Sequence, residues 1–216
     1  MRAPAAFLRS ISAYRAANVF NPWTERDPGT DRRGHGPQAR LARLCAHLDC
    51  APALLLLGEA AGYQGCHVSG IPFTSERLLL AGAIPRIAAP AGRLSTRPSP
   101  WSEPSATIVW GALHELGLAG RTILWNAFPW HPHRPGNPQS NRTPTAGEVE
   151  QGTPALAALL AAFPDVHVVA VGRKAEALLR DLGRVEAAVR HPAMGGAERF
   201  RAELRAFARR IGAVRS

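Results

Sequence analysis

Cysteine, lysine and long apolar runs are all scarce in this chain of 216 residues. Cysteine occurs three times, at Cys45, Cys50 and Cys66. This number is small and odd, which does not suit a disulfide framework, so we expect buried thiols in a reducing compartment. No stretch approaches the ~20 apolar residues that span a bilayer, and the N-terminal residues lack a signal-peptide core. The sequence therefore predicts a cytoplasmic protein with no membrane partner.

The positive charge of the sequence comes almost entirely from arginine. The formal net charge is +10 at pH 7, and the planar guanidinium group suits phosphate oxygens. A polyanionic partner would explain this excess. A general bias toward arginine and alanine would also explain it, so charge alone does not decide for nucleic acid.

Apolar residues make up 46% of the chain and charged residues 19%, which is typical of a soluble globular protein. The length favours a single domain over residues 1–216, with 1–37 as a partly irregular N-terminal extension. Short apolar runs predict strands at 53–57, 122–126, 166–172 and 185–190. Helical patterns lie at 38–48, 105–116, 145–163, 173–182 and 197–211.

Strands that alternate with helices indicate an α/β fold, here a three-layer α/β/α sandwich with a central, mostly parallel four-stranded sheet. In such sheets ligands bind beyond the carboxyl ends of the strands, so functional residues are expected there. Residues 21–37, 83–104 and 129–144 fit neither helix nor strand. Loops this long inside a compact fold are usually functional or mobile.

The first predicted strand is followed by the segment Gly58-Glu59-Ala60-Ala61-Gly62, and Phe73 comes shortly afterwards. Glycines let a backbone approach a ligand closely, and exposed N–H groups in such a turn can hold an anion. A purely structural turn, with Phe73 in the core, is the commoner reason for such a segment.

Two further polar residues follow predicted strands. Asn126 ends the second strand, and its amide carries a donor beside an acceptor, as recognition of a base edge requires. His191 precedes the last helix, where an imidazole can face a ligand. Each has a simpler alternative, because Asn often caps a turn and a lone His is usually a structural hydrogen-bonding residue.

The order and placement of these segments resemble the uracil-DNA glycosylase superfamily over about residues 54–200. The Gly-Glu-Ala start, the Pro-Phe pair and the Asn-Arg-x-Pro segment at 141–144 are most similar to a bacterial branch that normally carries an iron-sulfur cluster. The resemblance implies a monomeric, nucleoid-associated enzyme of base-excision repair. Such an enzyme flips uracil, or a related deaminated base, out of DNA and hydrolyses its N-glycosidic bond.

The resemblance also implies roles for individual residues. Phe73 would stack on the flipped base, Asn126 would hydrogen-bond its Watson–Crick edge, and His191 would stabilise the charge that develops on O2. Glu59 would orient water or balance the sugar cation. The other implied base contacts are Gly58, Ala60 and Gly62. The implied DNA contacts are Arg134, Arg142, Arg190 and the apolar wedge Met194, for which a place in the core is the alternative.

The chain departs from the superfamily pattern at three positions. Ala60 stands where several members place an Asp or Asn that positions water, which leaves open a non-catalytic or trapping uracil-DNA-binding protein. Gly62 stands where the best-known branch has a Tyr that excludes the thymine methyl, which leaves open another base such as hypoxanthine or a 5-modified uracil. Asn141 replaces a His that binds DNA covalently in one branch. Covalent trapping is therefore disfavoured, although His131 and His133 lie nearby.

The cysteines also bear on the cofactor. An iron-sulfur cluster of the kind found in the similar bacterial branch needs four cysteine ligands, and this chain has three cysteines without a Cys-x-x-Cys pair. A zinc site built from them with His47 or His67 is a minor alternative. The sequence therefore predicts no cofactor.

We expect the purified protein to be colourless and to stay folded in the presence of a chelator, because its cysteines cannot supply a cluster with four ligands. Visible absorption spectroscopy and iron analysis check this expectation. Stoichiometric iron with a cluster absorption band would contradict it.

Overall fold

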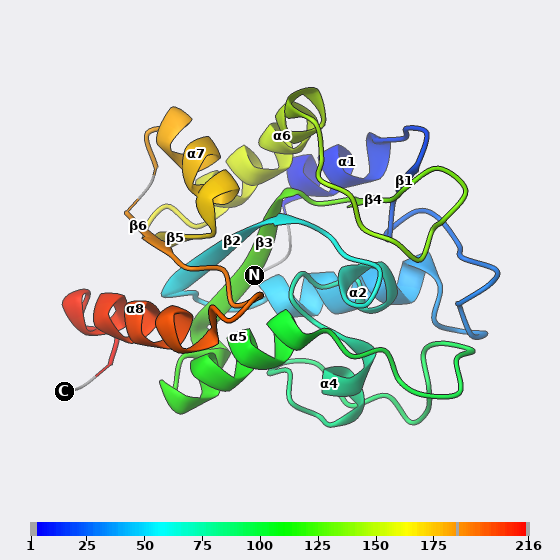
Figure 1. Ribbon diagram of the computed structural model, residues 1–216, viewed down its shortest axis with the longest axis horizontal. Helices are drawn as coiled ribbons and strands as arrows, with labels where there is room; N and C mark the ends of the chain where they lie inside the picture. Colours follow the sequence, from blue (N-terminus) through cyan, green and yellow to red (C-terminus); the bar gives the residue numbers. More distant parts are fainter. Residues whose placement is uncertain (1–3, 185, 215–216) are drawn as a thin grey trace.

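The computed structural model describes residues 4–184 and 186–214. Its main sheet has four strands in the order β3-β2-β5-β6, and every neighbouring pair is parallel. The strands are β2 (Leu54–Ala60), β3 (Thr122–Phe128), β5 (His167–Val171) and β6 (Ala187–Val189). The predicted α/β sandwich with a parallel four-stranded sheet is confirmed (Figure 1).

All five helical patterns in the sequence correspond to helices, with ends within two residues of the prediction. These helices are α2 (Pro37–Leu48), α5 (Pro104–Glu115), α6 (Ala146–Ala162), α7 (Arg173–Asp181) and α8 (Ala197–Arg210). The sequence did not indicate α1 (Ala5–Ala13), the short helices α3 (Cys66–Ser69) and α4 (Glu76–Leu80), or the 3-10 turn η1 (Ala119–Arg121). No helix in the described ranges is long and apolar enough to cross a membrane.

Alternating side chains along β2 divide the core into two layers. Leu55 and Leu57 pack in a cluster with residues of α1, α6 and α7, whereas Leu54 and Leu56 pack in a cluster with residues of α5 and α8. Figure 1 shows α6 and α7 on one side of the sheet and α5 and α8 on the other. Because both faces are covered, the strand is a continuous apolar run rather than an alternating one.

The N-terminal segment is more ordered than the sequence indicated. Helix α1 packs against α6, and Phe7 and Ile11 on its inner face are fully buried. The Phe7 ring lies 5.0 Å from that of Trp125 on β3. Val19 and Phe20 then form β1, which pairs antiparallel with β4 (His131–Pro132). The prediction missed α1 because it is short and has no side-chain cap, and its helical form depends on contacts with distant parts of the chain.

A buried carboxylate orders the long loop 83–104. The side chain of Glu76 accepts hydrogen bonds from the guanidinium of Arg93 (2.8 Å), from the backbone and hydroxyl groups of Ser95, and from the backbone N–H of Leu94 and Trp101. Burial alone would raise the pKa of Glu76, but these donors outweigh it and lower the pKa to about 2. The loop is therefore fixed by one anion with many donors.

Two buried histidines order the loop 129–144. Nδ1 of His67 lies 2.8 Å from Nδ1 of His131, whose Nε2 donates to the carbonyl of Ser140 at 2.8 Å. Nε2 of His67 lies 2.8 Å from a carboxylate oxygen of Asp27. These contacts give His131 a structural part in holding the loop.

Replacing Ile11 with Ala should lower the free energy of unfolding by about 2–5 kcal/mol, because it removes fully buried atoms from the packing of α1. Urea denaturation measures this change. Arg9 is exposed on the same helix, and Arg9→Ala should change stability by less than about 0.5 kcal/mol. Equal stability of Ile11→Ala and the parent would show that α1 is not part of the folded core.

Candidate functional site

The carboxyl ends of the central strands open into a cavity of about 620 Å³. Strands β2 and β3 supply its floor, and the loops after them and after β6 supply its walls. Eight of the residues implied by the sequence line this one cavity: Glu59, Ala60, Gly62, Phe73, Asn126, Arg142, His191 and Met194. The fold therefore brings together residues that are more than 100 positions apart in the chain.

Gly58 makes room for the two central side chains of the cavity. In the register of the parallel pair it lies directly opposite Asn126. A Cβ atom at position 58 would lie 2.6 Å from the side-chain amide of Asn126 and closer still to the ring of Phe73. The glycine is required by this close approach, which a strand-end motif alone does not reveal.

Asn126 is almost fully buried, with 2% of its surface exposed. Its amide is satisfied when the oxygen accepts the backbone N–H of Ala61 and the nitrogen donates to the carbonyl of Trp125, both at 3.2 Å. An amide can make more hydrogen bonds than these two. One N–H and one oxygen lone pair therefore remain, so the cavity has a donor beside an acceptor in a fixed orientation.

His191 presents a neutral imidazole to the same cavity. Its Nδ1 accepts the backbone N–H of Ala193 at 3.2 Å, so in the neutral ring the proton is on Nε2, which is free to donate. Burial is the main cause that lowers the pKa of His191 below its usual range. The ring centroid lies 6.4 Å from that of Phe73.

Two of the side chains at the cavity are held by unusual backbone. Phe73 and Met194 both have positive φ angles, 50° and 52°, in a region that bulky residues rarely adopt. Met194 is also 95% exposed, so the alternative of a core residue is wrong. The Met194 side chain therefore lies in solvent at the edge of the cavity.

Glu59 lies at the mouth of the cavity and is engaged by a lysine that the sequence did not single out. Its carboxylate accepts a hydrogen bond from Lys174 at 2.8 Å, and Lys174 also donates to the hydroxyl of Thr143 at 3.1 Å. The Glu59 side chain remains about one third exposed.

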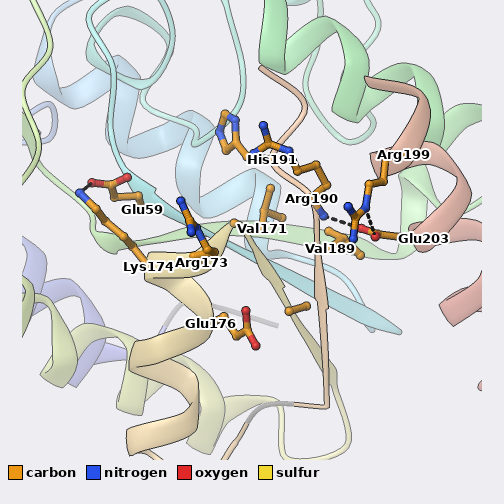
Figure 2. A pocket seen from close by; sticks show the side chains of 12 residues that line it. Glu59, Val171, Arg173, Lys174, Glu176, Val189, Arg190, His191, Arg199 and Glu203 are labelled. Atoms are coloured by element: carbon orange, nitrogen blue, oxygen red, sulfur yellow. Dashed lines mark hydrogen bonds and ion pairs between the residues drawn. The ribbon is translucent and has the colours of Figure 1, made fainter. Parts of the chain in front are cut away.

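A second cavity of about 530 Å³ adjoins the first, and both are lined by Glu59 and His191. Four basic side chains line it together with three carboxylates: Arg173, Lys174, Arg190 and Arg199 beside Glu59, Glu176 and Glu203. Figure 2 shows Glu59 with Lys174 on one side and Arg199 with Glu203 on the other. Arg190 is exposed, and its backbone N–H donates to Glu203 at 2.6 Å.

The structure gives the other two implied DNA contacts different surroundings. Arg142 makes a two-pronged ion pair with Glu148, at 2.6 and 2.7 Å, near the N-terminus of α6. Arg134 is exposed and lies in neither cavity. Arg142 therefore has a partner within the chain, whereas Arg134 presents its side chain to solvent.

Sequence reasoning missed Glu103 and the position of Asn141. Glu103 lines the cavity, and burial raises its pKa to about 7. A glutamate just before a helix is usually an exposed first-turn acid, so the sequence held no signal for this role. Asn141 accepts the backbone N–H of Tyr63 at 3.1 Å and borders Gly62.

The residues proposed for a zinc site make other contacts. Nε2 of His47 accepts the backbone N–H of Leu124 at 2.9 Å, and His67 lies between Asp27 and His131. Within residues 4–184 and 186–214, no three His, Cys, Asp or Glu side chains gather as a metal site would require. The absence of a cofactor stays a prediction.

Comparisons with known proteins agree with this geometry. The family model for the uracil DNA glycosylase superfamily matches residues 46–211. No curated protein matches the sequence. Among solved structures, the crystal structure of wild-type SMUG2 from Pedobacter heparinus is similar, with a TM-score of 0.58 and 14% identity, covering 96% of this chain and 97% of that chain. At this identity the likeness concerns the fold alone.

Gly58→Ala should lower the free energy of unfolding by about 1–3 kcal/mol, because the added Cβ overlaps Phe73 and Asn126. Gly62→Ala is the matched control, since a Cβ there would only touch the exposed Asn141 at 3.4 Å. Urea denaturation of the two variants compares them directly. If both are as stable as the parent, Phe73 and Asn126 do not meet above Gly58.

Proposed function

The chain belongs to the uracil DNA glycosylase superfamily, and from this we propose that it excises uracil, or a related deaminated base, from DNA. In this reaction the base leaves the stack, enters the cavity and is cut from its sugar by hydrolysis of the N-glycosidic bond. The observation that carries the proposal is that Phe73, Asn126 and His191 line a single cavity.

Asn126 accounts for the choice of base. Uracil presents a donor at N3 and an acceptor at O4, which match the free oxygen lone pair and the free N–H of the amide. Cytosine presents the reverse pattern. Because the backbone contacts of Asn126 fix the orientation of its amide, it cannot simply rotate to suit cytosine. A buried polar group left unpaired costs about 1–3 kcal/mol, which favours the deaminated base.

His191 accounts for the departure of the base. When the N-glycosidic bond breaks, negative charge develops on the base and positive charge on the sugar. A neutral imidazole that lines the cavity and carries its proton on Nε2 can donate to the uracil O2 as this charge grows. Comparable donors at oxyanion sites contribute about 3–4 kcal/mol to lowering the barrier.

Glu59 lines both cavities, and the neighbouring Ala60 offers no polar side chain that could position water. We propose that Glu59 stabilises the sugar cation and orients the attacking water. Its ion pair with Lys174 is partly exposed and worth little in water, so a DNA phosphate that attracts Lys174 can release Glu59 for this role.

The basic cavity beside the base site suits the DNA backbone. Arginine and lysine side chains there lie next to the point where a flipped nucleotide would enter, and phosphate contacts fix a duplex without reading its sequence. The exposed Met194 on the same rim is suited to fill the gap that the flipped base leaves in the stack. We propose that DNA lies across these two features.

Gly62 bears on how wide the base specificity is. The space beside it is bordered by the exposed side chain of Asn141 rather than by a ring. A base with a substituent at C5 therefore meets an amide that is hydrogen-bonded to the backbone N–H of Tyr63, instead of an aromatic ring. This observation favours uracils modified at C5 as additional substrates.

The proposal is tested with oligonucleotides that each carry one uracil, 5-hydroxymethyluracil, hypoxanthine or cytosine, followed by alkaline cleavage at abasic sites. The parent should excise uracil and leave cytosine. Asn126→Asp places two acceptors at the base edge and should reduce uracil excision at least about 10-fold, since 1.4 kcal/mol corresponds to a factor of ten. Asn137, which lines neither cavity, provides the matched control Asn137→Asp.

The outcomes separate the candidate functions. Excision of hypoxanthine or 5-hydroxymethyluracil in preference to uracil would assign another base. Tight binding of uracil-DNA without cleavage would identify a trapping protein. Uracil excision at the parental rate by both Asn126→Asp and Asn126→Ala would show that Asn126 is only a strand-end cap.

A further inference from the structure

One wall of the cavity is built around a carboxyl group that no part of the proposed reaction uses. Glu103 immediately precedes α5, and its side chain lines the same cavity as Phe73 and Asn126. Its Oε2 atom is inaccessible to solvent and has no hydrogen-bond partner among the described residues, whereas the residue as a whole is half-buried and lines the cavity. A Cβ atom at Gly65 would overlap this oxygen, so the glycine leaves a space that the carboxyl fills.

The surroundings of Glu103 do not stabilise a negative charge. The titratable group that faces it from α3 is Cys66, a thiol whose pKa is raised first by its own burial and then by Glu103. Among the residues that the structure describes, no arginine, lysine or histidine contributes to the pKa of Glu103, and burial is the cause of its rise. Such a carboxyl is mostly neutral below pH 7, for the same physical reason as the protonated acids of some enzyme active sites.

The other charged groups that line the cavity are already paired. Glu59 is bonded to Lys174, and Arg142 is bonded to Glu148. His191 also lines the cavity, with its pKa lowered by burial, so it stays neutral as the pH rises above 7. Within this cavity, Glu103 is therefore the group that changes its charge near neutral pH.

A neutral carboxyl has the hydrogen-bonding pattern of an amide, with one O–H donor beside a carbonyl acceptor. We propose that the Glu103 carboxyl contacts the flipped base and donates a hydrogen bond to a carbonyl oxygen of that base. This inference rests on the proposed function and adds a second base-reading residue to Asn126.

The chemical consequence concerns the class of base that the cavity accepts. Deamination converts an exocyclic amine, which donates, into a carbonyl, which accepts. A donor on the Glu103 wall therefore favours the deaminated base over its parent, as Asn126 does. Ionised Glu103 would instead present only acceptors, and it would repel the carbonyl oxygens of uracil and the negative charge that develops on the base.

The test is the pH dependence of kcat/KM on a single-stranded oligonucleotide with one uracil, measured from pH 6 to 8.5. For the parent, kcat/KM should fall about tenfold per pH unit above pH 7, as the protonated fraction falls, until it reaches the level of Glu103→Ala. Glu103→Gln keeps a donor and an acceptor and does not titrate, so its profile should be flat over this range and match the parent at pH 6. Glu150→Gln, an exposed change on α6, should follow the parent.

Thermal melting gives a second readout that does not need catalysis. The folded pKa of Glu103 is raised from 4.5 to about 7, so its folded state binds the proton more tightly and stability is lost as the pH rises through this interval. Glu103→Gln removes that loss. The difference in melting temperature between Glu103→Gln and the parent should therefore favour the variant more at pH 8 than at pH 5. The same difference at both pH values would show that the pKa of this carboxyl is not raised by burial, and would overturn the inference.

The outcomes distinguish this inference from the function on which it rests. If the parent excises uracil but Glu103→Gln shares its pH profile, or Glu103→Ala is fully active, the inference is wrong and the function stands. If the parent neither cleaves uracil-DNA nor binds it more tightly than undamaged DNA, the function and the inference both fall.

Discussion

The parallel pairing of β2 with β3 places Gly58 beside Asn126, and the geometry of the cavity depends on this register. The missing side chain at Gly58 lets the ring of Phe73 approach the amide of Asn126 from the neighbouring loop. Because side chains alternate along a strand, a slip of one residue would turn Asn126 away from the cavity and bring Trp125 or Ala127 in its place. The many buried leucine and tryptophan contacts of these two strands prevent such a slip, so the core and the site depend on the same pairing.

Rigid loops are the second condition for a base site, because recognition by a single amide requires walls that do not move. In this protein the rigidity comes from buried polar groups. Glu76 accepts six hydrogen bonds from backbone and side-chain donors and fixes the loop before α5, which delivers Glu103 to the cavity. The contact between His67 and His131 fixes the loop that carries Asn141. Burying the Glu76 carboxylate or either histidine without hydrogen-bond partners would cost free energy, so these contacts hold each loop in one conformation.

Charge is divided between the two adjoining cavities. The first holds His191, Glu103 and the paired Glu59 and Arg142, and the second is lined by four basic side chains beside the carboxylates of Glu59, Glu176 and Glu203. This division suits a nucleotide, whose uncharged base and charged phosphate need different surroundings. Glu59 and His191 lie where the two cavities meet, which is where the bond between base and sugar would lie. The arginine-rich composition thus contributes Arg173, Arg190 and Arg199 to the second cavity, a placement that composition alone could not locate.

The sequence by itself determined the strands, the five main helices and the place of Asn126 and His191 after strands, because these follow from local apolar periodicity and from short motifs. The sequence was also enough to assign the chain to the superfamily, and the match over residues 46–211 confirms this assignment. Only the tertiary structure decided that α1 belongs to the core, that Lys174 binds Glu59 and that Glu103 lines the cavity with its pKa raised by burial. Each of these depends on contacts between residues far apart in the chain, and burial and pairing are properties of a neighbourhood that no local pattern encodes.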